Sequence, residues 1–242
     1  MNIIVADHYE ALSKEAAKII EEQLQTKLGS VLGLATGSTP LGLYEELIQG
    51  HRERDVSYKH VHTLNLDEYV GLDKHHPQSY HVFMNKRLFN HINIPLKQTH
   101  IPSGDASSLL DECKRYELVI DEVGPPDIQV LGIGQNGHIG FNEPGSSFAG
   151  ITHITELAHS TREANARFFS SPEDVPTHAI TMGIKSILKS KHILLLASGA
   201  KKAAAIQRLL TGEANEAFPA SALYGHPNVT LIVDKEAYKE ME

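Results

Sequence analysis

The sequence predicts an α/β fold with a mostly parallel sheet, and three observations support this. Short runs rich in Val, Ile and Leu recur along the chain. Amphipathic segments long enough for helices lie between these runs. Several of the runs are almost continuously apolar, which is typical of strands that are covered on both faces. Strands that alternate with helices in this way form parallel sheets with right-handed crossovers.

The N-terminal half of the chain contains three expected strands and three expected helices. In the first helical segment Leu12, Ala16 and Ile20 fall on one stripe, which is typical of a helix packed against a core. A proline in the first turn favours a helix start at Pro40. In chain order the elements are the strand Asn2–Ala6, the helix Tyr9–Lys27, the strand Ser30–Ala35, the helix Pro40–Gln49, the strand Val61–Leu66 and the helix Ser79–Asn90.

The C-terminal half continues the pattern with four expected strands and two expected helices. Pro125 and Pro126 predict a turn before a strand rather than a linker between domains. Because the chain shows no repeat and no low-complexity tract, residues 1–242 are expected to form a single domain. The elements are the helix Ser108–Val123, the strands Ile128–Ile133, His178–Gly183 and Lys191–Ala197, the helix Ala200–Leu210 and the strand Val229–Val233.

The composition excludes several classes of protein. Among 242 residues, 30 are Asp or Glu and 22 are Lys or Arg, so the net charge of −8 argues against nucleic acid or a membrane surface as a partner. A single cysteine excludes a disulfide scaffold and a cysteine-based zinc site. No apolar run approaches the ~18 residues of a membrane span, and the acidic N-terminus does not resemble a signal peptide. We therefore expect a cytoplasmic protein.

Polar or glycine-rich segments follow four of the expected strands. In a parallel sheet the carboxyl ends of the strands meet at one edge, which is where ligands bind in open α/β folds. These segments are therefore expected to line one site. They are Thr36–Pro40, Asp67–Tyr69, Gly134–Gly145 and Ser198–Lys202.

The segment Thr36–Thr39 has the features of an anion-binding loop. Its Gly-Ser-Thr turn exposes backbone N–H groups, and the helix that begins near Pro40 points its positive end to the same place. Lys202, early in a later helix, could reach a phosphate held there. The alternatives are a plain turn with Thr39 as N-cap and, for Lys202, a solvated surface lysine. No Gly-Lys-Ser/Thr follows, so the segment is not a Walker loop.

The loop after the strand Ile128–Ile133 combines glycines with a histidine. Glycines at positions 132, 134, 137, 140 and 145 let the backbone approach a ligand and offer N–H groups to an oxyanion. His138 lies between Asn136 and Glu143, an arrangement suited to proton transfer near neutral pH. A proline and a glycine soon follow, so the G-x-G-x-x-G match opens no helix and predicts no dinucleotide site. No set of residues at ligand spacing accompanies His138, so no metal is expected.

Two further segments carry candidate functional residues. In the pair Asp67-Glu68, one carboxylate is suited to act as a base while the other caps or pairs; a capping role alone is the alternative. Ser160–Glu163 resembles a capping box that opens a short helix. Arg167 is four residues beyond this segment's glutamate, so it is suited to a surface ion pair. Prolines flank an acidic stretch after it, and residues 160–176 are a candidate for a mobile lid.

These segments together closely resemble the glucosamine-6-phosphate deaminase family, whose members are also called glucosamine-6-phosphate isomerases. The matching stretches are in the family's order and span most of the chain. The string His-Ile-Gly-Phe-Asn-Glu-Pro discriminates best, because the related 6-phosphogluconolactonases share the glycine-rich histidine loop but continue differently after the histidine. The stretches are Leu34–Pro40, Asn65–Tyr69, Gly132–Pro144, Ala164–Phe169 and Ser198–Lys202.

The resemblance implies a Rossmann-like three-layer α/β/α sandwich that converts glucosamine 6-phosphate to fructose 6-phosphate and ammonia in amino-sugar catabolism. It makes Asp67 the base that moves a proton from C2 to C1, and His138 the group that assists ring opening, oriented by Glu143. It implies a small-molecule sugar phosphate as partner, with no cofactor and no metal. The residues implied to hold the phosphate are Thr36, Gly37, Ser38, Thr39, Arg167 and Lys202.

Two departures from the family pattern bear on mechanism and regulation. Asn136 stands where some members have an aspartate beside the histidine, so this position can form hydrogen bonds but carries no charge. Some members are hexamers activated by N-acetylglucosamine 6-phosphate through basic residues after the Glu-Pro loop and a longer C-terminus. Because Gly150–Thr155 contains no Lys or Arg and the sequence stops at Glu242, we expect no such activation and a monomer or small homo-oligomer.

Two other functions stay open at this point. A 6-phosphogluconolactonase-type hydrolase would use His138 as a base on water and would not need Asp67, so Asp67→Asn distinguishes the two enzymes. A non-catalytic sugar-phosphate sensor, as part of a transcription regulator, would need a DNA-binding segment. The first 30 residues carry only three lysines on an acidic helix and predict no helix-turn-helix.

Overall fold

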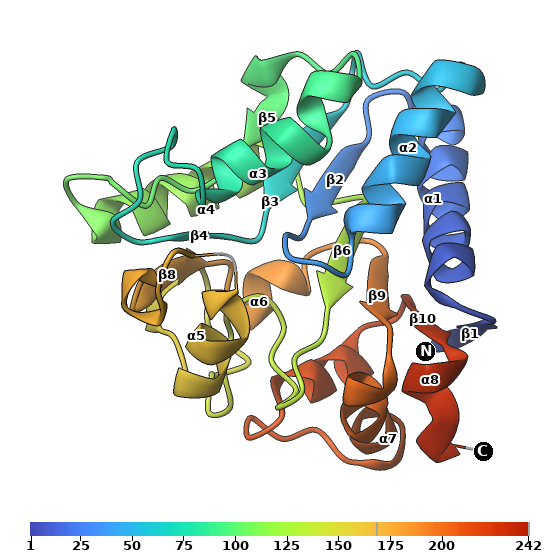
Figure 1. Cartoon of the computed structure of the whole chain (residues 1–242). Coiled ribbons are helices and arrows are strands. Elements are labelled where there is room, and N and C mark those ends of the chain that lie inside the picture. Colours follow the sequence, from blue (N-terminus) through green and yellow to red (C-terminus); the bar gives the residue numbers. More distant parts are fainter. Residues whose placement is uncertain (168, 242) are drawn as a thin grey trace.

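The larger of two sheets forms the centre of the molecule (Figure 1). The computed structural model describes residues 1–167 and 169–241, so Phe168 of the expected lid segment and Glu242 lie outside the described residues. Within this part of the chain the large sheet has seven strands, and every neighbouring pair is parallel. In spatial order they are β1 (Asn2–Ala6), β10 (Val229–Asp234), β9 (Ile193–Ala197), β6 (Ile128–Gly132), β2 (Val31–Leu34), β3 (His62–Asn65) and β5 (Thr99–His100).

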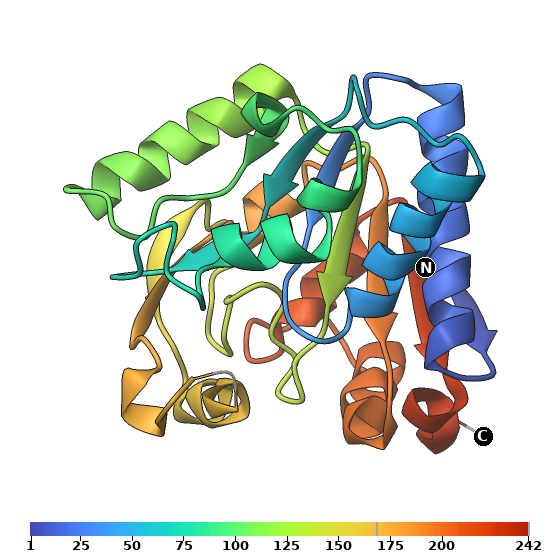
Figure 2. The same ribbon diagram turned by 45° about the horizontal axis from the view of Figure 1, so that its top comes forward.

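Helices cover both faces of this sheet, which gives the expected three-layer α/β/α arrangement. In Figures 1 and 2, α2 and α3 cross in front of the strands and α6 lies behind them, while α1 and α2 pack side by side. Burial by helices on both faces explains why the central strands are almost wholly apolar. The helices are α1 (Tyr9–Thr26), α2 (Leu41–Glu53), α3 (Tyr80–Arg87), α4 (Leu109–Val123), α5 (His159–Ala166), α6 (Ile184–Ile187), α7 (Ala203–Thr211) and α8 (Lys235–Tyr238).

The apolar run His178–Gly183 forms a strand, but it does not belong to the parallel sheet as the alternating pattern predicts. Its strand β8 (His178–Thr181) lies in a second sheet, antiparallel to both β4 (Asp67–Tyr69) and β7 (His153–Glu156). The prediction is wrong because an apolar run indicates a buried strand but not the sheet to which it belongs, and Ala179, Ile180 and Thr181 are buried in the small sheet.

The chain passes from the large sheet to the small one at Leu66. The Leu66 amide donates to the carbonyl of Leu34 in β2 at 3.1 Å, and the Leu66 carbonyl accepts from the amide of Met182, after β8, at 2.7 Å. One residue therefore ties the two sheets together, and the residue that follows it, Asp67, lies at their junction.

The order of the strands creates a switch point between β2 and β6. From β2 the chain builds outward through β3 to β5, whereas from β6 it builds in the opposite direction through β9 to β10. The loops beyond the carboxyl ends of β2 and β6 consequently diverge and leave a crevice, which is where open α/β sheets bind ligands. Among the described residues, no helix combines the length and apolar character that crossing a membrane requires.

Candidate active site

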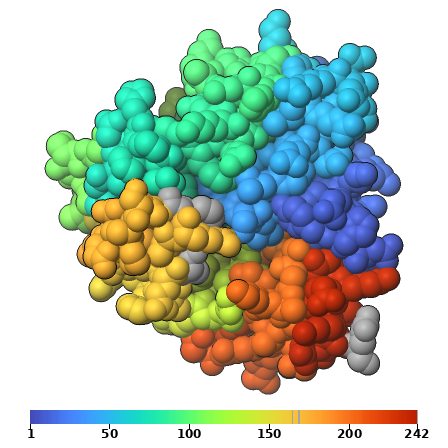
Figure 3. Space-filling view, in the orientation of Figure 1, coloured from blue at the N-terminus to red at the C-terminus, as the bar shows by residue number. Residues whose placement is uncertain are grey.

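A cavity of about 500 Å³ lies at this switch point, a volume typical of small-molecule sites. Figure 3 shows three segments, far apart in the sequence, on one face of the molecule. They are α2 (blue), the region around α5 (yellow) and residues near position 200 (orange). Of the candidate catalytic and phosphate-binding residues singled out from the sequence, nine lie on the cavity wall, whereas Glu68 and Glu143 do not line it. The nine residues are Thr36, Gly37, Ser38, Thr39, Asp67, Asn136, His138, Arg167 and Lys202.

The loop Thr36–Thr39 is held open towards the cavity by a residue from another helix. The hydroxyl of Tyr9, the first residue of α1, lies 3.1 Å from the Ser38 carbonyl and 3.0 Å from the Thr39 carbonyl, and it accepts from the Gly42 amide at 2.7 Å. Gly37 has a φ of +87°, a conformation that side chains oppose. Thr39 is not the N-cap of α2; that position is Pro40, which has no capping side chain. The loop hydroxyls are therefore not used in capping.

Two cationic side chains face this loop from distant parts of the chain. Arg167, at the end of α5, donates from Nη2 to the Ser38 hydroxyl at 3.2 Å. Lys202 ends the short 3₁₀ helix Ala200–Lys202 after β9, and it lines the same cavity. Burial lowers the pKa of Lys202, and the nearby charge of Arg167 lowers it further. Two cations that repel one another beside a hydroxyl-rich turn form a site suited to a multiply charged anion.

The carboxyl group of Asp67 lies in the cavity, although only 5% of the residue is exposed. Burial raises its pKa to about 8, with a further contribution from the charge of Glu68. A carboxyl group with a pKa near the working pH is suited to accept and return a proton. The glycine-rich loop passes over it: a Cβ added at Gly140, whose φ is +57°, would lie 3.6 Å from Asp67 Oδ2.

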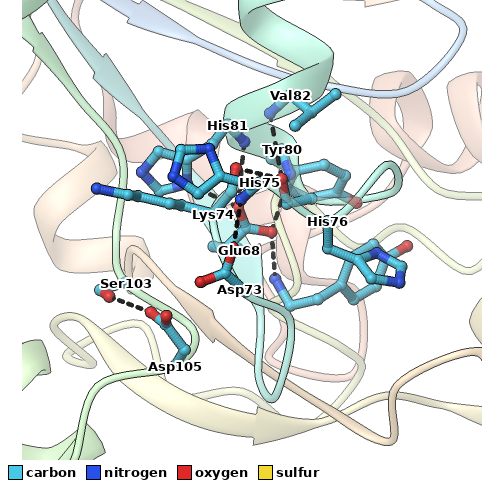
Figure 4. Close-up of polar contacts among 12 residues, drawn as sticks. Glu68, Asp73, Lys74, His75, His76, Tyr80, His81, Val82, Ser103 and Asp105 are labelled. Carbon is cyan, nitrogen blue, oxygen red and sulfur yellow. Dashed lines mark hydrogen bonds and ion pairs between the residues drawn. The ribbon is translucent and has the colours of Figure 1, made fainter.

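The adjacent carboxylate, Glu68, has a different role, as one of the sequence alternatives anticipated. Side chains alternate along a strand, so Glu68 and Asp67 point to opposite faces of β4. Glu68 lies against the first turn of α3, beside Tyr80 and His81 (Figure 4). It accepts from the amides of Tyr80 and His81 at 3.0 and 3.2 Å and from its neighbour's amide at 2.9 Å. Glu68 thus satisfies helix amides that would otherwise be unpaired.

His138 and Glu143 lie together at the end of the glycine-rich loop. His138 Nδ1 is 3.5 Å from Glu143 Oε2, the separation of an ion pair rather than of an ordinary hydrogen bond. Asn136 Nδ2 donates to the same Glu143 oxygen at 2.8 Å, and the Thr161 hydroxyl donates to the other oxygen at 2.5 Å. Burial opposes ionisation of Glu143, but the charge and proximity of His138, together with Thr161 and Asn136, lower its pKa to about 2.

Two glycines of this loop, Gly134 and Gly137, allow close packing and donate hydrogen bonds within the loop. A Cβ added at Gly134 would lie 2.4 Å from the His138 ring, so glycine makes room for the imidazole. The Gly134 and Gly137 amides donate inside the loop, to the carbonyls of His138 and Gly134. The sequence suggested that the loop offers amides to an oxyanion; these two are already engaged.

Several polar or aromatic residues on the cavity wall were given no role in the site by the sequence analysis, among them Tyr80, Gln135, Thr161 and Asn165. Tyr80, at the start of α3, gave no signal, because its approach to the cavity depends on how Glu68 caps that helix. The sequence pattern placed Thr161 in a capping box. Asn165 is four residues later on the same face of α5, and this helical spacing is a signal that could have placed both residues on the cavity wall. Gln135 adjoins the predicted residue Asn136.

The helix α5 does not begin with the capping box expected at Ser160–Glu163. It starts at His159 with Ala158 as N-cap, and no side chain caps it. The prediction is wrong because Thr161 lies inside the helix and its hydroxyl donates to Glu143 instead. The region 160–176 places both Thr161 and Arg167 at the cavity, as a lid would; its movement stays a prediction.

The fold and the site define an enzyme of the sugar-phosphate isomerase and lactonase class. Residues 6–232 match the family described as glucosamine-6-phosphate isomerases/6-phosphogluconolactonase, and the chain belongs to this family.

Within the family, its close relatives are deaminases. A glucosamine-6-phosphate deaminase of Geobacillus sp. (strain WCH70) is 56% identical over 237 residues, which cover 98% of this chain and 94% of that protein. A solved structure of a monomeric glucosamine-6-phosphate deaminase, 50% identical, aligns with a TM-score of 0.98 over 99% of both chains. A 6-phosphogluconolactonase from Trypanosoma cruzi, at 20% identity and a TM-score of 0.77 over 99% of this chain and 96% of the other, shares the fold.

Proposed function

We propose that the chain converts glucosamine 6-phosphate and water to fructose 6-phosphate and ammonia, as a step of amino-sugar catabolism. One observation carries this proposal: a buried carboxyl group, Asp67, shares a cavity with both an anion-binding loop and a histidine–glutamate pair. An isomerase that moves a proton between two carbons needs a carboxylate at this place, whereas a lactonase needs only a base for water.

The phosphate of the substrate would occupy the loop Thr36–Thr39. Its negative oxygens would accept from the hydroxyls and amides of the loop and from Arg167 and Lys202, whose mutual repulsion a phosphate relieves. Binding at this end fixes the sugar so that its reacting carbons lie towards Asp67 and His138, on another part of the cavity wall.

The first chemical step would open the pyranose ring. His138 is suited to pass a proton between the C1 hydroxyl and the ring oxygen, because the Glu143 carboxylate lies against its Nδ1 and orients the ring. Asn136 and Thr161 hold Glu143 in place through one hydrogen bond to each oxygen. This step produces the open aldehyde, whose C2 hydrogen is acidic.

Asp67 would then take the C2 proton as a carboxylate while the C1 oxygen gains a proton, which leaves an enolamine between C1 and C2. Asp67 would return a proton to C1 as the nitrogen lone pair forms the double bond to C2, which gives a protonated imine. Water adds to this imine, and ammonia leaves to give the ketone of fructose 6-phosphate. A pKa of about 8 suits both directions of transfer at Asp67, since neither protonation state is strongly favoured near neutral pH.

The test is the release of fructose 6-phosphate and ammonia from glucosamine 6-phosphate, measured for the wild type and for Asp67→Asn. Equal amounts of both products from the wild type alone support the proposal. Hydrolysis of 6-phosphogluconolactone that persists in Asp67→Asn would favour the lactonase. Binding of sugar phosphates with turnover of neither substrate would favour a sensor.

A further inference from the structure

The two carboxylates of β4 lie on opposite faces of the strand, and one histidine contacts the outer one. The Glu68 side chain is 1% exposed, yet it lies next to Asp67 in the chain and its charge reaches that residue. Besides the backbone amides of α3, it contacts His81, whose Nδ1 lies 3.0 Å from Glu68 Oε2 (Figure 4). His81 is half-buried and does not line the cavity.

Other charged groups near this pair lie towards solvent. Lys74 belongs to the loop after β4, and Asp105, after β5, accepts from the Ser103 hydroxyl at 2.6 Å. The hydrogen bond from Ser103 lowers the pKa of Asp105, and the charges of His81 and Lys74 lower it further. Glu68 itself is shielded from water. The His81 ring contacts its carboxylate directly.

On the inner face, Asp67 is surrounded by tyrosine hydroxyls and by the charge of Glu68. Burial raises the pKa of these hydroxyls, which keeps them neutral where the enzyme works. The hydroxyls belong to Tyr44, Tyr69, Tyr80 and Tyr116. Glu68 is therefore the charged group that acts most directly on the proton of Asp67.

We propose that His81 is a positioning residue that donates to Glu68, offsets its charge and thereby sets the pH range in which Asp67 acts as the base. This inference rests on the proposed function, since it takes Asp67 as the proton carrier. The physical reason is that charges interact strongly across a few ångströms of protein, where little water screens them. Without His81, the field of Glu68 would hold the proton on Asp67 more tightly.

The test compares the pH dependence of kcat/KM for deamination in a set of variants. His81→Phe removes the donor and is expected to move the ascending limb of the profile to higher pH by about one unit. Glu68→Gln keeps an acceptor for the α3 amides but removes the charge, so the limb should move to lower pH. His81→Asn keeps a donor near the position of Nδ1 and should restore part of the wild-type profile. His60→Phe removes an exposed histidine before β3, at the far end of the sheet, and is the matched control.

The double variant His81→Phe/Glu68→Gln separates an electrostatic role from a structural one. If His81 acts through Glu68, replacing it has no further effect on the limb once Glu68 is neutral. A limb that stays at the wild-type pH in His81→Phe, with kcat lower at every pH, would overturn the inference and leave His81 a structural residue. Retention of wild-type turnover by Asp67→Asn would instead overturn the proposed function, so the two failures are distinguishable.

Discussion

Asp67 combines a position in the cavity with an environment that opposes its charge. The unfolded chain would release its proton near the ordinary pKa of 3.8, while the folded protein retains it up to about 8. Between these pH values Asp67 binds a proton in the folded state but not in the unfolded state. Its contribution to the free energy of unfolding therefore falls as the pH rises. The proposed reaction thus needs a residue whose ionisation lowers the free energy of unfolding.

We therefore expect Asp67→Asn to be inactive but more stable than the wild type. The variant loses the group whose ionisation costs stability, so its advantage in the free energy of unfolding should grow from about pH 4 to about pH 8. A gain of about 1–3 kcal/mol at the upper end is expected. Urea denaturation at several pH values measures it, and a difference that does not depend on pH would contradict the assignment.

Glu143 behaves in the opposite way, because its partners favour the charged form. Its pKa of about 2 lies below the ordinary value of 4.5, so its stabilising contribution is complete above about pH 4.5 and is lost as the pH falls towards 2. In Glu143→Gln we expect kcat to fall about 10- to 100-fold, since His138 loses its orienting carboxylate. The stability difference from the wild type should shrink below about pH 4.5.

The control for this variant is Glu163→Gln on α5. Its carboxylate lies 3.5 Å from His159 Nδ1 in an exposed pair, with side chains 69% and 83% accessible, and such pairs contribute little to stability. Activity and acid stability should match those of the wild type. Equal loss of kcat in both variants would mean that any change of charge in this region impairs the enzyme.

The sequence could predict most of the site at the residue scale, because the polar residues stand out at the ends of apolar strands. It could not separate the roles of Asp67 and Glu68, which depend on the strand alternation and on the position of α3. It also could not find Thr161 as the partner of Glu143, since the two are 18 positions apart in the sequence and a strand lies between them.

At the scale of elements, α5 connects the loop Thr36–Thr39 to the glycine-rich loop. Its Thr161 reaches Glu143, and Arg167 at its end reaches Ser38, so one short helix contacts both halves of the cavity. A substrate that bridges these two halves would favour the position of α5 in which Thr161 contacts Glu143 and Arg167 lies beside the loop Thr36–Thr39.

Arg167→Ala is expected to raise KM for glucosamine 6-phosphate about tenfold or more, because a charge-assisted contact to the phosphate is lost. The fall in kcat should be smaller, because Arg167 is proposed to bind the phosphate and not to take part in the proton transfers. Steady-state kinetics give both constants, and Arg52→Ala, an exposed arginine in the last turn of α2, serves as the control. An unchanged KM would show that Arg167 takes no part in binding phosphate.

The pattern of apolar residues predicted where the longer strands and helices lie along the chain. It did not predict to which sheet each strand belongs. The run His178–Gly183 reads as a strand of the parallel sheet, and only its antiparallel partners β4 and β7 show otherwise. The strands β4 and β5 are two or three residues long, too short for any periodicity to appear in the sequence.

At the scale of the whole molecule, the order of the strands creates the site. The alternation of strands and helices predicts a parallel sheet, but which strands become neighbours depends on packing between distant segments. The divergence of the chain at β2 and β6, and with it the crevice, therefore emerges only from the assembled fold.

We expect the enzyme to act as a monomer or small homo-oligomer with hyperbolic kinetics, unaffected by N-acetylglucosamine 6-phosphate. The stretch Gly150–Thr155 offers no Lys or Arg to bind a second phosphate. Light scattering measures the mass, and initial rates with and without the effector measure the response. A rise in rate or a sigmoidal curve that the effector abolishes would contradict this expectation.

The most direct test of the central claim follows the C2 hydrogen of the substrate. Wild type and Asp67→Asn are incubated with glucosamine 6-phosphate in D₂O, and NMR records hydrogen at C2 of the substrate and at C1 of the product. The account predicts that the wild type forms fructose 6-phosphate with the C2 hydrogen carried to C1 or exchanged for deuterium. It predicts that Asp67→Asn binds the substrate, yet releases no product and leaves the C2 hydrogen in place. Loss of that hydrogen at the wild-type rate in Asp67→Asn would show that another residue is the base.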